Sequence, residues 1–166
     1  FVGVSLLAGL TVGVVLVVCG IPRSMSLVLG CTTALVLTAY MLYFFRDPER
    51  YPPQDPNAVI APADGVVAQI TELDSARFLE VARFCGMSDA LAKDFSKGST
   101  TRISIFLNVF DVHVNRTPVA GTIRDVTYRR GLFLVASKER CSEENEQNVV
   151  TIETPDGSTV VFKQIA

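Results

Sequence analysis

The sequence is poor in the residue types that build metal and redox centres. Its 166 residues include one histidine and no tryptophan, and the four cysteines stand apart at positions 19, 31, 85 and 141. Zinc and dithiol motifs need closely spaced ligands, and a single histidine cannot supply a His-rich ligand set. We therefore expect no metal site and no disulfide framework.

Charge is also scarce in one part of the chain. Residues 1–45 carry a single charged side chain, Arg23, whereas all 17 acidic residues lie after residue 45. The net charge is −2, and no block of Lys and Arg is present that could neutralise nucleic-acid phosphates. These features exclude a nucleic-acid-binding protein, and a hydrophobic fraction of 49% excludes a disordered chain.

Two long apolar runs make up the first part of the chain. Residues 1–20 have no charge and would rise about 30 Å as a helix, which is one hydrocarbon thickness. A polar break at 21–24 separates them from a second run at 25–45, which ends in aromatic residues. We interpret residues 1–45 as a hairpin of two transmembrane helices.

The basic residues around the second run indicate an orientation. Arg46 and Arg50 follow this run, whereas Arg23 alone lies in the connecting turn. Because basic residues are enriched on the cytoplasmic side, we expect a protein of the cell membrane whose following domain is cytoplasmic.

The composition of the chain changes at residue 46. Four prolines in residues 46–57 predict an extended linker. Alternating apolar residues between turn signals predict two short strands within 58–70 and further strands at 101–116, 119–128, 132–136, 149–154 and 158–165, with one helix within 75–95. The turn at 155–157 predicts a β-hairpin. We therefore expect residues 58–166 to form a β-rich, mainly antiparallel domain, barrel-like or sandwich-like, that is incomplete at its C-terminus.

The strand expected at 101–116 contains the most informative pattern. Alternate positions from 103 to 109 are apolar, after which the apolar residues move to the opposite face. A strand can exchange faces only through a bulge or bend, here near Phe110, and bulges are frequent beside active sites.

The only histidine, His113, follows this point among Asp111, Asn115 and Arg116. Histidine can act as a general acid or base near neutral pH, and polar groups in an apolar strand need partners. A purely structural histidine is the alternative. Asp64 lies in a Pro-Ala-Asp-Gly turn, where geometry alone favours aspartate, and the acidic run at 143–146 has the composition of a solvated loop.

Five motifs in sequence order resemble the phosphatidylserine decarboxylase proenzymes, most closely their short bacterial and archaeal branch. The motifs are FFRDP at 44–48, APADG at 61–65, FDVHVNR at 110–116, GLFL at 131–134 followed by ENEQN at 144–148, and VFKQIA at 161–166.

The resemblance implies a pyruvoyl-dependent enzyme that converts phosphatidylserine to phosphatidylethanolamine and CO2. In this family a serine that follows a glycine attacks the preceding carbonyl, and the chain splits to leave a pyruvoyl group on a separate alpha chain. The pyruvoyl carbonyl is an electron sink for decarboxylation. By resemblance, His113 is the acid–base residue and Asp64 supports self-cleavage, while Arg116 and Asn115 are candidates for binding the substrate.

Two features depart from the family pattern. The larger branch has a second histidine where this chain has Arg116, and a guanidinium cannot act as a base. His113 would then serve in both steps, or Arg116 would bind the lipid phosphate. Because no cleavage motif follows Ile165, we expect the pyruvoyl serine beyond Ala166 and read the chain as the inactive beta-chain part of a proenzyme. Gly98-Ser99 imitates a cleavage signal but precedes the histidine.

A non-catalytic alternative is a membrane-anchored adaptor with a lipoyl-like or biotinyl-like sandwich, whose hairpin also resembles residues 61–67. Such carriers modify a lysine in a tight hairpin, and no such lysine is evident. The partners implied by the enzyme interpretation are phosphatidylserine in the bilayer and the protein's own alpha chain, and the sequence leaves open whether a homodimer forms.

Overall fold

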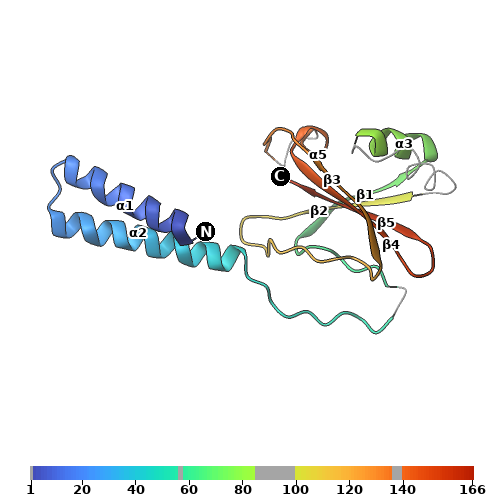
Figure 1. The fold of residues 1–166 in the computed structure, drawn as a ribbon, viewed down its shortest axis with the longest axis horizontal. Helices are drawn as coiled ribbons and strands as arrows, with labels where there is room; N and C mark the ends of the chain where they lie inside the picture. The colour runs from blue at the N-terminus through green and yellow to red at the C-terminus, as the bar shows by residue number, and fades with distance from the viewer. Residues whose placement is uncertain (1, 56–57, 85–99, 136–139) are drawn as a thin grey trace. The chain divides into compact units, whose positions relative to one another are not determined.

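The chain divides into two compact units. The structure is a computed structural model that describes residues 2–55, 58–84, 100–135 and 140–166 (Figure 1). The first unit combines Phe1–Glu49 with Leu107–Val114, and the second combines Arg50–Phe106 with Asn115–Ala166. The elements are α1 (Val2–Val18), α2 (Arg23–Phe44), β1 (Val66–Leu73), α3 (Ser75–Phe84), β2 (Thr100–Phe106), β3 (Thr122–Arg129), α5 (Cys141–Glu144), β4 (Gln147–Glu153) and β5 (Thr159–Ile165).

Helices α1 and α2 pack against each other as an antiparallel hairpin (Figure 1). Small residues recur every four positions on both helices: Ser5, Gly9 and Gly13 on α1, and Ser26, Gly30 and Ala34 on α2. A Cβ atom on Gly9 would lie 2.5 Å from the Gly30 carbonyl oxygen, and Ser5 and Ser26 are only 2% and 1% exposed. This spacing of small residues lets helix backbones approach closely where the surroundings are apolar.

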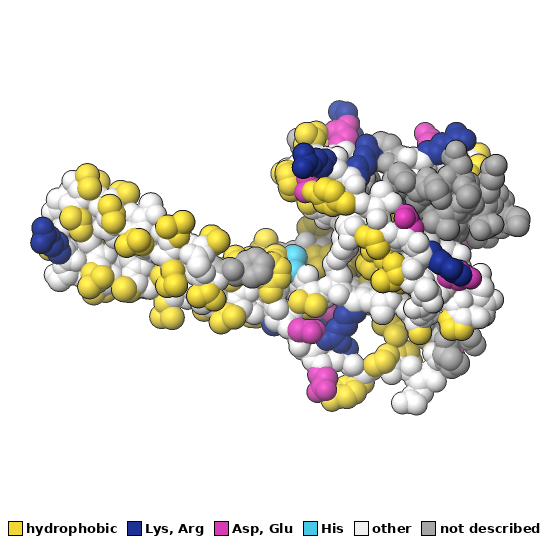
Figure 2. Space-filling model, viewed as in Figure 1, with side chains coloured by type: hydrophobic (Ala, Val, Ile, Leu, Met, Phe, Trp, Pro, Cys, Tyr) yellow, Lys and Arg dark blue, Asp and Glu magenta, His cyan; other side chains and the backbone are white. Residues whose placement is uncertain are grey.

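The helical hairpin is apolar on its outer surface as well. Figure 2 shows hydrophobic side chains spread along it, and Leu10 and Leu27 are examples of exposed leucines. Among the described residues, α2 is the one helix that is long and apolar enough to cross a membrane, while α1 has 17 residues. The two predicted helices are confirmed as helices, and their crossing of a membrane stays a prediction.

The second unit holds two antiparallel sheets (Figure 1). β1 pairs with β2, and the other sheet has the order β3-β4-β5. The predicted β4–β5 hairpin is confirmed: Gly157 has φ +84°, and the Thr154 backbone N–H donates to the Ser158 carbonyl at 2.9 Å. In the described residues neither sheet closes, so the antiparallel prediction is confirmed and the barrel-like one is wrong.

A small core joins helix α3 to both sheets. Phe78 and Ala82 lie one helical turn apart on α3 and cluster with Leu73 of β1 and Val149 of β4. The helix predicted within 75–95 is confirmed for residues 75–84. The rest of that prediction lies outside the described residues, as do Gly98 and Ser99.

Two of the predicted strands are absent, and a third is shorter than predicted. Residues 58–65 form no strand, although the Ile60 backbone N–H donates to the Pro118 carbonyl at 2.8 Å. Leu132 makes only an isolated bridge with Asn145. The strand expected at 101–116 ends at Phe106, because the chain leaves the sheet there. The exchange of apolar faces therefore marks the end of a strand and not a bulge within it.

Candidate active site

A tight turn at residues 108–111 precedes His113. The Asp111 backbone N–H donates to the Asn108 carbonyl at 3.0 Å. The Asp111 carboxylate accepts hydrogen bonds from the Asn108 backbone N–H at 2.8 Å and from its side-chain amide at 2.7 Å, and Asn108 Oδ1 accepts from the Phe110 N–H at 2.8 Å. Asp111 therefore has a structural task, which is to close the turn.

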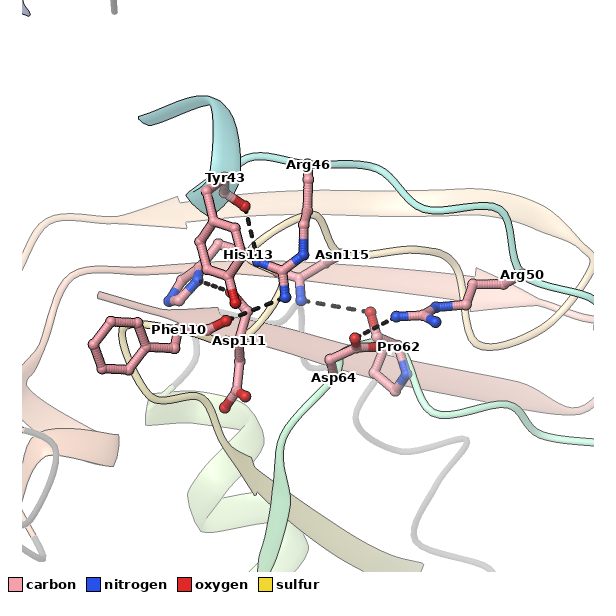
Figure 3. Close-up of polar contacts among 9 residues, drawn as sticks. All are labelled: Tyr43, Arg46, Arg50, Pro62, Asp64, Phe110, Asp111, His113 and Asn115. Carbon is pink, nitrogen blue, oxygen red and sulfur yellow. Dashed lines mark hydrogen bonds and ion pairs between the residues drawn. The ribbon is translucent and has the colours of Figure 1, made fainter. Parts of the chain in front are cut away.

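The His113 ring is held by helix α2. It stacks on Phe44 with ring centroids 3.6 Å apart and an interplanar angle of 18°, and its backbone N–H donates to the Phe44 carbonyl at 3.2 Å. Nδ1 lies 3.0 Å from the Asp111 carbonyl oxygen (Figure 3). A carbonyl oxygen can only accept, so this contact places a proton on Nδ1 and leaves Nε2 with the lone pair of the neutral ring. Nε2 is thus the nitrogen able to take up or deliver a proton.

Asp64 lies in the second unit, in the turn that leads into β1. Its carboxylate forms an ion pair with Arg50 (Figure 3), and both side chains are about half exposed. An exposed ion pair contributes little to stability, and this one places a guanidinium beside the Asp64 carboxylate. The next residue, Gly65, has φ +138°, and a Cβ there would lie 2.4 Å from the Phe106 carbonyl oxygen, so only glycine fits the turn.

Asn115 and Arg116 lie against Pro62 in the same unit. The Arg116 backbone N–H donates to the Pro62 carbonyl at 2.9 Å, and the Asn115 side-chain amide approaches the same oxygen at 3.4 Å (Figure 3). Asn115 Oδ1 accepts from the Gln164 side chain at 2.9 Å. The structure therefore brings together three of the sequence motifs, which contribute Pro62, Asn115 and Gln164.

The predicted site residues thus fall into two groups. Asp64, Asn115 and Arg116 belong to the second unit and gather around the turn at Pro62, whereas His113 belongs to the first unit and is positioned by α2.

Sequence reasoning missed Asn145. It is 1% exposed, its side-chain amide donates to the Leu134 carbonyl at 2.9 Å and to the carbonyl of Ala166, and its Oδ1 accepts from the Leu134 N–H at 2.8 Å. The interpretation of residues 143–146 as a solvated loop is wrong at this position. The only signal was that Asn145 lies within the ENEQN motif, because acidic neighbours conceal a buried amide.

Comparison with known sequences decides the family. A sequence profile described as phosphatidylserine decarboxylase matches residues 37–166, which include His113, Asp64, Asn115 and Arg116. The chain belongs to the phosphatidylserine decarboxylase family.

Curated relatives agree with the family profile. The phosphatidylserine decarboxylase proenzyme of Solibacter usitatus is 50% identical over 133 residues, covering 80% of this chain and 52% of the relative. Those of Desulfotalea psychrophila and Wolbachia pipientis are 40% and 38% identical, covering 80% and 81% of this chain and 54% and 53% of the relatives. The chain therefore spans about half the length of these decarboxylase proenzymes. The family predicted from the five motifs is confirmed.

Proposed function

We propose that the protein containing this chain decarboxylates phosphatidylserine to phosphatidylethanolamine. The observation that carries the proposal is the family match over residues 37–166, which includes every predicted site residue. Relatives at 38–50% identity are named as decarboxylase proenzymes. This favours the enzyme over the adaptor alternative.

The cofactor that the family implies is a pyruvoyl group, and the donor set of the second unit fits such a group. The Asn115 side-chain amide can donate to a carbonyl oxygen, and the exposed Arg116 offers a permanent cation for an anionic phosphate. The group supplies an electron-accepting carbonyl for decarboxylation. We place its serine beyond Ala166, in the alpha chain that the proenzyme releases on cleavage.

The residues of this chain then have distinct tasks. His113 would take up a proton at Nε2 and deliver it to the substrate α-carbon at the position that CO2 leaves, which returns the ring to its neutral form. The contact of Nδ1 with the Asp111 carbonyl keeps Nε2 as the exchanging nitrogen. Arg116 binds the lipid phosphate. Asp64, oriented by Arg50, supports the group that accepts the serine proton during self-cleavage.

We further propose that the helical hairpin spans the cell membrane and that the second unit is cytoplasmic. Support comes from the length and composition of α2 and from Arg46 and Arg50 beyond its end. A substrate with two acyl chains stays in the bilayer, so an enzyme anchored there meets it by diffusion in two dimensions. The partners are phosphatidylserine and the alpha chain, and a homodimer is a further alternative.

The test is to express the complete reading frame and to reconstitute the protein into vesicles that contain phosphatidylserine. We expect the chain to split and phosphatidylethanolamine to form, as measured by mass spectrometry of the lipids. Residues 1–166 alone should form none. Turnover by this fragment would contradict the placement of the serine and would direct attention to Ser99.

A further inference from the structure

The turn at residues 108–111 carries two apolar side chains at its tip. Val109 and Phe110 occupy the two central positions and are 56% and 65% exposed. The hydrogen bonds of Asn108 and Asp111 close the turn from both sides, so the two apolar side chains are held outward by a fixed backbone. Burial of these two side chains in an apolar environment would therefore be favourable, with no rearrangement of the backbone needed.

The tip is fixed to the end of helix α2. The Tyr40 hydroxyl donates to the Val109 carbonyl at 3.2 Å. Figure 3 shows the neighbouring contact, in which the Arg46 guanidinium donates to the Phe110 carbonyl at 3.2 Å. The same guanidinium bonds the Tyr43 carbonyl at 2.8 Å and lies 3.9 Å from the centre of the Tyr43 ring. Both carbonyl oxygens at the tip therefore have donors, which lowers the cost of removing them from water.

The surroundings of the tip are those of a membrane interface. Tyr43 and Phe45 are partly exposed at the end of α2 and are followed by Arg46. Aromatic residues and a cation at the end of an apolar helix mark the level of the lipid head groups. Val109 and Phe110 are tied to this same end, so they lie at that level if α2 spans a bilayer.

We propose that the 108–111 turn is a membrane wedge, with Val109 and Phe110 inserted among the lipids beside the end of α2. The wedge fixes the depth of His113, whose ring is stacked on Phe44 in the last turn of the helix. It therefore presents the acid–base residue at the level where the carboxylate of a bilayer lipid lies. This inference rests on the proposed membrane insertion of the helical hairpin and deepens it.

The test uses the complete, self-processed protein in vesicles that contain brominated phosphatidylcholine, which quenches tryptophan fluorescence. Residues 1–166 contain no tryptophan. The emission added by Phe110→Trp should be lost in brominated vesicles. The added emission of Phe133→Trp, at an exposed aromatic position of the second unit, should be retained. Three results would overturn the wedge. The first is quenching of the tryptophan at position 110 by aqueous iodide, and the second is its shielding from both quenchers by the alpha chain. The third is equal quenching by brominated lipid at positions 110 and 133.

A second pair of variants tests the consequence for the reaction. Phe110→Asp should lower the rate of decarboxylation of phosphatidylserine in vesicles, whereas Phe110→Leu, which keeps an apolar side chain, should keep the parent rate. Unchanged turnover of Phe110→Asp would overturn the proposed role of the wedge. Alkaline carbonate extraction of the parent protein separates the two hypotheses. Its release would contradict the membrane hairpin itself, whereas retention without quenching at position 110 would contradict the wedge alone.

Discussion

The imidazole of His113 is oriented by its neighbours and not by deep burial. The Phe44 ring fixes its plane, and the Asp111 carbonyl fixes its tautomer. Neither contact involves a carboxylate, because one partner is an aromatic ring and the other is a backbone carbonyl. If His113 is the acid–base residue that we propose, a ring held in this way is already oriented for proton transfer.

Substitution of His113 tests its role in the full-length proenzyme. His113→Ala should lower turnover by about 100-fold or more, because a positioned general acid or base typically contributes this much. Lipid products report decarboxylation, and gel electrophoresis reports chain splitting. Phe44→Leu should retain splitting but lower turnover less, since it removes the stacking and leaves the imidazole. Wild-type behaviour of His113→Ala would make the histidine structural.

Asp64 should act mainly on maturation. Asp64→Ala should slow chain splitting, because the carboxylate that orients the proton acceptor is lost, while any matured enzyme should keep most of its turnover. A time course of splitting measures this. Arg50→Lys keeps a cation beside the carboxylate and serves as the matched control, which should mature near the normal rate. Splitting of Asp64→Ala at the normal rate would contradict the proposed role of Asp64 in self-cleavage.

Sequence patterns nominated the four site residues but could not give their partners. His113 contacts Phe44, and Asp64 pairs with Arg50. These partners are too far apart in the sequence for the periodicity of a helix or strand to indicate them. Alternation tells which face of an element a residue occupies, but it does not tell which remote element covers that face. Asn145 was missed for the same reason, because its partners Leu134 and Ala166 come from distant segments.

Among the elements, prediction from the sequence succeeded where neighbouring residues alone determine the conformation. The turn at 155–157 was predictable because the preferences of proline, aspartate and glycine are local. Residues 58–65 and 132–135 have apolar alternation but do not join a sheet. The Ile60 N–H donates to the Pro118 carbonyl in a loop, and the Leu132 N–H donates at 2.7 Å to the carbonyl of Glu144 at the end of α5. Apolar alternation is therefore a weaker predictor than a turn motif in this domain.

The β4–β5 hairpin should depend on pH through Asp156. The Thr154 and Ser158 hydroxyls donate to its carboxylate and hold the pKa of Asp156 below its ordinary value. This contribution is present above the pKa of the unfolded chain and is lost as pH falls through the lower folded-state pKa. Asp156→Asn should therefore lower the Tm at pH 7, and the difference from the parent should shrink in acid. A difference that is constant with pH would contradict this.

The helical hairpin should depend on its close approach at Gly9. Gly9→Val should destabilise the packing of α1 on α2 by about 1–3 kcal/mol, since an oversized side chain in a packed contact costs this much. A Cβ at Gly3 meets no atom within 4 Å, so Gly3→Val is the matched control. Unfolding in detergent, followed by circular dichroism, distinguishes them. Equal stability of the two variants would contradict the packing.

The molecule as a whole should be an integral membrane protein. After high-salt and alkaline carbonate washing, the full-length protein should stay in the membrane pellet, because apolar burial and not charge holds it there. Immunoblotting of pellet and supernatant measures this, with a soluble marker protein as control. The sequence predicted both helices from apolar length alone, but the small residues that pack them were not recognised.

The division of the chain into units has a consequence for the order of events during synthesis. The chain passes between the units at 49–50, again at 106–107 and once more at 114–115. Tyr40 therefore emerges from the ribosome 69 residues ahead of Val109, whose carbonyl it binds. At about 5–20 residues per second this is a delay of roughly 3–14 s, during which the end of α2 has no turn docked on it. The helical hairpin can complete its own packing in that interval, so we expect it to serve as the template on which the turn that carries His113 later settles.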